Sequence, residues 1–249
     1  MSDICVHLYA LCWNEERMLP YFFRHYDALV DRYFIYDNDS DDRSREILEK
    51  HPRVTLERFA FRGSFLEAAR NFYDHCWKAS RGTADWVLVC NIDEHLDHAD
   101  LPGYLLSCSR RGITLIVPEG YEMVSPTFPD DQVFPEDGLP LCRQIRTGVR
   151  SPRLDKPQLF RPDHLREMNF EAGRHSARPE GLVKCPRQTE VKLLHYKHLG
   201  PDYFSRRLSE LGDKIPHIDI CNRNHQYEWD DERKRGEFRR LAETAVILD

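Results

Sequence analysis

The chain has 249 residues, of which 41% are hydrophobic, so it can bury the core of one large α/β domain or two small ones. It carries 36 Lys and Arg against 42 Asp and Glu, a net charge of −6, which argues against the basic face that nucleic-acid binding needs. No apolar run has the length of a transmembrane helix and no signal-peptide pattern opens the chain, so we expect neither a transmembrane segment nor a nucleic-acid partner.

The first half of the sequence alternates between strand-like and helix-like segments. Short apolar runs bounded by turn residues predict strands, and apolar residues at helical spacing predict helices. In chain order the predicted elements are a strand at 4–11, a helix at 15–30, a strand at 33–36, a helix at 43–50, a strand at 54–59, a helix at 65–79, a strand at 86–92, a helix at 101–110 and a strand at 113–117. This alternation is typical of an α/β fold with a mostly parallel sheet covered by helices on both faces.

The second half has a different pattern. Residues 118–150 are rich in Pro, Gly and charge and have no clear period, so we expect an irregular functional loop or lid there. Further strands are predicted at 158–161 and 191–196, followed by helices at 201–211 and 230–248.

Polar clusters follow three of the first four predicted strands. They are Asn14-Glu15-Glu16, Asp37-Asn38-Asp39 and Asn91-Ile92-Asp93-Glu94. Because the carboxyl ends of parallel strands meet at one edge, we expect these clusters to lie together where open α/β sheets bind ligands. Carboxylates at such an edge suit Mg²⁺ or Mn²⁺ held against a diphosphate, or the polar edge of a base or ribose.

Each cluster also has a purely structural interpretation. Residues 37–42 can equally be a solvated turn that caps a helix, and Asn14 can cap the helix that follows it. The structural interpretation is weaker for Asp93 and Glu94, because the end of a buried strand is a costly place for charges without partners.

Further motifs, taken with the clusters in order, resemble a family-2-type glycosyltransferase of the GT-A fold, in the nucleotide-diphospho-sugar transferase superfamily. These motifs are Arg70-Asn71, Asp85-Trp86-Val87, the segment Lys-Pro-Gln-Leu-Phe-Arg-Pro at 156–162, Gly173-Arg174-His175 and Leu193-Leu194-His195-Tyr196. The resemblance implies a GT-A-like, Rossmann-type sandwich with a mostly parallel central sheet and an irregular C-terminal acceptor half. It also implies one domain over 1–249, with a nucleotide-binding half at 1–117 and an acceptor half at 118–249.

The resemblance implies inverting transfer of a sugar from a nucleotide-sugar donor, most often a UDP-sugar, to a hydroxyl of a glycan, a lipid-linked acceptor or a small molecule. Asp93 matches the metal-binding Asp that ends the family's D-x-D motif, and His195 would complete the shell of Mn²⁺ or Mg²⁺. Without the resemblance, His195 would be interpreted as a core histidine on an apolar strand. Asn91 departs from the first Asp of the motif and loses one negative charge. A catalytically inactive nucleotide-sugar-binding protein is therefore the alternative.

By the same resemblance, donor contacts are expected from the three clusters, the third helix and the turn after Gly173. The candidates are Asn14, Glu15, Asp37, Asp39, Arg70, Asn71, Asn91, Ile92, Asp93 and His175. For Arg70 and Asn71 a plain helix face is an equal alternative. An inverting transferase also needs a carboxylate base, for which Glu119 and Glu122 are the candidates. Their rivals are Asp130, Asp131, Glu136 and Asp137.

A metal-dependent phosphohydrolase or nucleotidyltransferase is a second alternative. No D-x-D-x-T/V motif ends an early strand, and Cys12-Trp13-Asn14-Glu15 stands where a nucleotidyltransferase would have a Gly-rich phosphate loop. The eight cysteines form no C-x-x-C pair, so no zinc site of that type is expected. Scattered thiols are typical of a reducing compartment, and we expect a cytoplasmic protein that can be peripheral at a membrane.

Overall fold

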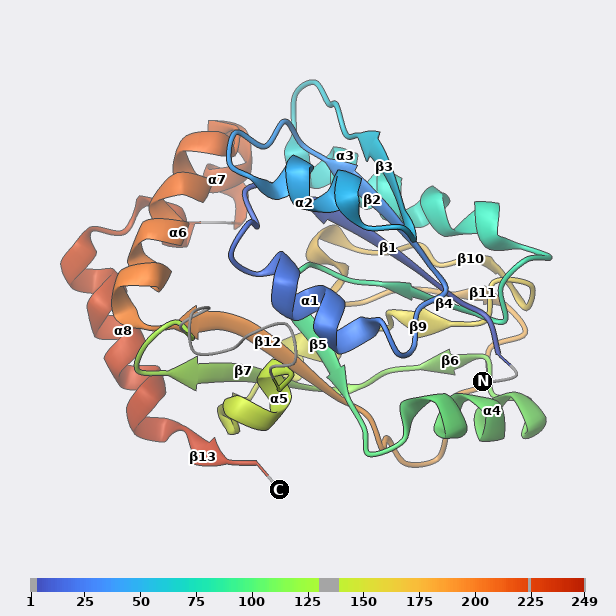
Figure 1. Ribbon diagram of the computed structural model, residues 1–249. Coiled ribbons are helices and arrows are strands. Elements are labelled where there is room, and N and C mark those ends of the chain that lie inside the picture. Colours follow the sequence, from blue (N-terminus) through green and yellow to red (C-terminus); the bar gives the residue numbers. More distant parts are fainter. Residues whose placement is uncertain (1–3, 130–138, 224, 249) are drawn as a thin grey trace.

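The computed structural model describes residues 4–129, 139–223 and 225–248 (Figure 1). Its larger sheet has the strand order β3-β2-β1-β4-β9-β6. The bounds of these strands are β1 (Val6–Cys12), β2 (Arg32–Asp37), β3 (Val54–Arg58), β4 (Trp86–Val89), β6 (Leu115–Ile116) and β9 (Leu159–Phe160). Strands β3, β2, β1 and β4 are mutually parallel, and only β9 runs against its neighbours. The predicted α/β class with a mostly parallel central sheet is confirmed.

The register of the sheet aligns the strand ends that carry polar clusters. Cys12 at the end of β1 lies opposite Asp37 at the end of β2, and Tyr9 lies opposite Val89 of β4. All four residues of β4 are buried, as expected for a strand covered on both faces. The three predicted clusters therefore emerge at the same edge.

Helices cover both faces of this sheet. They are α1 (Leu19–Tyr26), α2 (Ser44–Lys50), α3 (Phe65–His75), the 3₁₀ helix η1 (Cys76–Ser80) and α4 (Leu101–Arg110). The helix predicted at 15–30 is shorter in the structure, because residues 13–17 form a turn and Pro20 falls in the first turn of α1, where its missing N–H costs nothing. Tyr26 of α1 is buried against the second sheet, where its hydroxyl accepts from Leu96 N and donates to Glu94 O, both at 2.9 Å.

The second sheet has the order β13-β8-β7-β12-β5. Its strands are β5 (Glu94–Asp97), β7 (Glu119–Ser125), β8 (Thr147–Arg150), β12 (Lys192–Leu199) and β13 (Val246–Ile247). The prediction of an irregular stretch over 118–150 is wrong for its described part, which contains β7, α5 (Leu141–Gln144) and β8. Two glutamates and a buried glycine in β7 hide its alternation; the side chain of Glu122 lines a cavity, while Glu119 is exposed.

The chain passes from the first sheet to the second between β4 and β5. Strand β5 runs antiparallel to β12, with Glu94 opposite His195, and β12 runs parallel to β7, with His195 opposite Glu122. Residues 90–93 therefore lie at the junction of the two sheets. No local pattern in the sequence predicts the strand at 94–97.

The remaining elements close one end of the molecule. Figure 1 shows α6 (Pro201–Lys214) and α8 (Asp231–Thr244) side by side, beyond the strand ends of both sheets. The others are α7 (His217–Arg223), the 3₁₀ helices η2 (Pro152–Leu154), η3 (Ala172–Arg174) and η4 (His225–Glu228), and the ribbon of β10 (Leu165–Glu167) and β11 (Glu180–Gly181). None of the helices in the described part of the chain has the length and apolarity needed to cross a bilayer.

Candidate active site

A cavity of about 600 Å³ opens at the carboxyl ends of β1, β2 and β4. Helix α3 and the segment from η2 to η3 line part of it, and α6 and residues 225–229 line the rest. Strand-end residues Trp13, Asn38 and Asp93 reach it from the first sheet, and Glu122 and His195 reach it from the second. A cavity of this size at this edge is where an α/β sheet binds a small-molecule ligand.

His195 lies between two carboxylates. Its Nε2 is 3.2 Å from Asp93 Oδ2, and its Nδ1 is 2.8 Å from Glu122 Oε2. Burial lowers the pKa of His195, but the charges of Glu122 and Asp93 outweigh burial and raise that pKa to about 10. The same contacts hold the pKa of Asp93 below, and that of Glu122 well below, the ordinary values, although burial opposes this.

The donor set fits a divalent cation of the manganese or magnesium type. Nδ1–H donates to Glu122, so a cation that displaced the hydrogen of Nε2 would meet the Nε2 lone pair beside Asp93, the arrangement in which a carboxylate orients a metal-binding histidine. Carboxylate oxygen and imidazole nitrogen together suit Mn²⁺. The described residues contain no cluster of three or more His, Cys, Asp or Glu that could hold an ion by themselves. A bound diphosphate and water would have to supply the other ligands, as is usual for Mg²⁺ sites.

Glu94, the next residue along, does not face the cavity. Its side chain is fully buried, contacts Lys156 Nζ and lies 3.3 Å from Arg174 Nη2. Burial raises its pKa, but the charges of Lys156 and Arg174 outweigh burial and hold the pKa well below the ordinary value. Glu94 is therefore the counter-ion of two buried cations, which removes it from the possible metal ligands.

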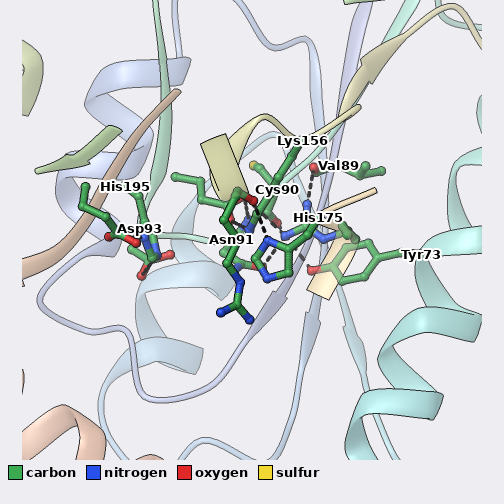
Figure 2. A network of polar contacts seen from close by, with 12 residues as sticks. Tyr73, Val89, Cys90, Asn91, Asp93, Lys156, His175 and His195 are labelled. Atoms are coloured by element: carbon green, nitrogen blue, oxygen red, sulfur yellow. Dashed lines mark hydrogen bonds and ion pairs between the residues drawn. The ribbon is translucent and has the colours of Figure 1, made fainter. Parts of the chain in front are cut away.

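Arg174 connects this buried ion pair to Asn91. Its Nη1 donates to Val89 O and its Nη2 to Asn91 Oδ1, both at 2.6 Å, and its guanidinium carbon lies 4.3 Å from the centroid of the Tyr73 ring. Figure 2 shows Asn91 between the Asp93–His195 pair and Tyr73. Because Arg174 uses the amide oxygen, Nδ2 of Asn91 remains as a donor, and it makes no hydrogen bond to another described residue.

Glu15 is the one acidic residue of the first cluster that lines the cavity. Its Oε1 is 2.5 Å from Arg207 Nη2 of α6, which also donates to Trp13 O. Burial raises the pKa of Glu15 to about 7, although the charge of Arg207 lowers it. The guanidinium carbon of Arg207 lies 5.3 Å from the centroid of the Trp13 ring, so α6 is tied to the loop that follows β1.

The other predicted residues of the first two clusters do not line the cavity. Asn14 bonds to Ser40 and Asp41, while Asp37 is fully buried and accepts from Arg45 at 3.2 Å. Asp39 is half exposed and pairs with Arg58 at 2.7 Å. These contacts lock the turns after β1 and β2 together, and the neighbouring Asn38 reaches the cavity instead.

Some of the remaining predicted residues line the cavity and others do not. Ile92, Arg70 and His175 line the cavity, whereas Asn71 and Glu119 are exposed outside it. The rival bases Asp130, Asp131, Glu136 and Asp137 lie outside the described residues.

Several site residues were not assigned roles from the sequence. Lys156 and Arg174 stand in quoted motifs, but only their burial beside Glu94 reveals their function as counter-ions. Arg207 has no local signal, since it meets Glu15 from a position 192 residues away. His198 of β12 is 6% exposed, because its ring packs 4.5 Å from that of Phe204, and its Nδ1 lies 3.5 Å from Glu122.

The chain was compared with known families and proteins. No family model matches it. A glycosyltransferase family 92 protein of Oryza sativa subsp. japonica is 30% identical over 86 residues, which are 33% of this chain and 14% of that protein. The match confirms the resemblance to glycosyltransferases over that third of the chain. The matched segment is a small part of the rice protein, so the match does not extend the activity of the whole rice protein to this chain.

Solved structures give weaker similarities. S. aureus TarS 1-349 in complex with UDP is 10% identical with a TM-score of 0.47, covering 97% of this chain and 70% of that one. Glucosyl-3-phosphoglycerate synthase from Mycobacterium tuberculosis, in complex with Mn²⁺, UDP and phosphoglyceric acid, is 18% identical with a TM-score of 0.33, covering 48% of this chain and 44% of that one. At these scores the likeness carries no conclusion about activity.

Proposed function

We propose that the protein is a glycosyltransferase that binds a nucleotide-sugar, most simply a UDP-sugar, in the 600 Å³ cavity and transfers the sugar to an acceptor hydroxyl with inversion. The observation that carries the proposal is the convergence of Asp93 and His195 at 3.2 Å where the two sheets meet, with Glu122 fixing the far side of the imidazole. Strand-end oxygens beside an oriented histidine are suited to a metal-bound diphosphate.

The charges around the cavity favour the same class of ligand. Arg70, Arg153 and Lys197 line it, and none of these three cations has a carboxylate within ion-pair distance among the described residues. Burial lowers the pKa of Lys197, and the charges of Glu122 and Asp93 oppose that effect. An anionic diphosphate would bring the missing negative charge into the cavity and would be stabilised as it departs.

Asp93 and His195 would hold Mn²⁺ or Mg²⁺. When bound, such an ion neutralises charge on the diphosphate leaving group. Within the proposal, Asn91 donates from Nδ2 to an oxygen of the donor, and Glu15 with Arg207 keeps α6 and Trp13 closed around the nucleotide. The seven described cysteines are free thiols, which suits the cytoplasm as the compartment.

Thermal-shift and calorimetric titrations with UDP, CDP, ADP and GDP, each with and without Mn²⁺, test the proposal. We expect UDP to give the largest shift, Mn²⁺ to enhance it, and Asp93→Ala to abolish the enhancement. Asp213→Ala is the matched control, because Asp213 is exposed on α6 and does not line the cavity. An enhancement that survives Asp93→Ala would refute the metal site.

The alternative of an inactive binding protein rests on Asn91, whose neutral side chain stands where the D-x-D motif has its first, charged Asp. Release of UDP from UDP-sugars, followed with water or simple polyols as acceptors, separates the two functions. Tight UDP binding with no turnover of any donor would favour the binding protein.

A further inference from the structure

The tautomer of His175 is fixed by the chain. Its ring lies in the cavity wall beside η3, and Nδ1 is 2.8 Å from the carbonyl oxygen of Arg153. A carbonyl oxygen can only accept, so Nδ1 carries the hydrogen and Nε2 carries the lone pair. Nε2 makes no hydrogen bond to another described residue. His175, which lines the cavity, therefore keeps one basic nitrogen without a hydrogen bond to the described residues.

The carboxylates that line the cavity in the described part of the chain are all engaged. Glu15 is paired with Arg207, and Asp93 and Glu122 share the two nitrogens of His195. Freeing one of these to accept a proton would break an ion pair or disturb the proposed metal site. His175 can accept a proton without losing any contact, because its bond to Arg153 O uses the other nitrogen.

We propose that His175 is the general base of the transfer reaction, an inference that rests on the proposed function. Nε2 takes the proton of the acceptor hydroxyl while the hydroxyl oxygen forms its bond to the anomeric carbon. The bond from that carbon to the diphosphate oxygen breaks, and its electron pair leaves with the nucleoside diphosphate. The imidazolium then returns its proton to water, which restores the starting state.

The position of His175 supports this role. Arg174, the residue before it, holds the amide of Asn91, so the same short segment reaches both the proposed donor contact and the base. Figure 2 shows the His175 ring beside Asn91, at a distance from the Asp93–His195 pair. The base would thus lie apart from Asp93 and His195, the residues proposed to hold the metal.

Neighbouring charges tune the basicity of His175. Burial and the charges of Lys156 and Arg153 lower its pKa to about 4, while the bond to Arg153 O and the charge of Glu94 oppose the lowering. The ring is therefore neutral at pH 7 and able to accept a proton. A diphosphate bound in the same cavity would add negative charge to it and raise the pKa of His175 toward neutrality, which improves the base when the donor is present.

Nitrogen NMR of the protein labelled with ¹⁵N-histidine tests the ground state. At pH 7 we expect His175 to show a protonated Nδ1 and an unprotonated Nε2, and to titrate at higher pH when UDP and Mg²⁺ are bound. His175→Gln identifies the resonance. A protonated Nε2 at pH 7 would overturn the proposal.

Turnover tests the role itself. In His175→Gln we expect UDP release from a UDP-sugar to fall by at least about 100-fold, the usual contribution of a general base, with UDP affinity and donor KM within a few-fold of the wild type. His75→Gln is the matched control, since His75 Nδ1 also lies 2.8 Å from a backbone carbonyl oxygen, that of Asn71, but outside the cavity. Wild-type turnover in His175→Gln would overturn the proposal, whereas failure of the wild type to bind any nucleotide would overturn the proposed function first.

Discussion

Glu122 Oε2 lies 2.8 Å from His195 Nδ1, and this contact determines which nitrogen of His195 faces Asp93. The pairing follows from the parallel register of β7 and β12, which sets the two residues opposite each other. Glu122 was a candidate base in the sequence. Its place on the far side of the imidazole suits the orientation of a metal ligand instead.

Removing Glu122 should therefore weaken metal-assisted binding. For Glu122→Ala we expect the Mn²⁺-dependent part of UDP affinity to fall about 10- to 100-fold, the usual effect of losing the partner of a metal-binding histidine. Calorimetric titration of UDP with and without Mn²⁺ measures it. Glu119→Ala is the control, since Glu119 is on the same strand but exposed outside the cavity. Equal Mn²⁺-dependent UDP affinity in Glu122→Ala and Glu119→Ala would contradict the role of Glu122 in orienting His195.

Asn91 and Asp93 should affect binding in different ways. Asn91→Ala removes a donor held by Arg174, and we expect UDP affinity to fall about 10-fold, close to one hydrogen bond, while Mn²⁺ still enhances binding. Asp93→Ala should instead remove the enhancement of UDP binding by Mn²⁺. The same titrations distinguish the effects, and loss of the Mn²⁺ enhancement in Asn91→Ala would assign Asn91 to the metal after all.

The sequence predicts the first sheet well because its strands carry their own signal. Strand β4 is a run of four apolar residues, and every one is buried. The second sheet is harder to predict, since β5 and β7 include residues that turn toward a cavity or an ion pair and break the apolar alternation. Their strand character depends on pairing with β12, a long-range contact that no local pattern encodes.

The same reasoning applies to the site. The resemblance predicts a role for Asp93 and His195, and the structure brings them to 3.2 Å. It could not predict that Glu122, 73 residues before His195, would be the third member. Nor does any spacing indicate that Glu94 would turn away from Asp93 into a buried ion pair with Lys156, because this depends on the sheet junction.

The buried contacts of Glu94 with Lys156 and Arg174 should contribute strongly to the free energy of unfolding. Arg174→Met leaves the fully buried Glu94 with one partner fewer, and breaking a buried pair on one side costs about 3–5 kcal/mol of unfolding free energy. Urea unfolding at pH 7 measures the loss. Arg166→Met is the control, because the Arg166–Glu180 pair is exposed and such pairs contribute about 0–1 kcal/mol. If Arg174→Met lowered the free energy of unfolding as little as the control does, Lys156 alone would be enough to balance the charge of Glu94.

Acid should destabilise the protein through the partly buried His25. His25 stacks on His95 with ring centroids 4.6 Å apart, and burial lowers its pKa to about 4 although its bond to Leu96 O opposes this. The unfolded chain takes up the proton near pH 6.5, so stability falls as the pH drops from about 6.5 to about 4, by roughly 3 kcal/mol from this group. His25→Gln should flatten that slope in urea unfolding between pH 4 and 8. An unaltered slope in His25→Gln would assign the acid sensitivity to other groups.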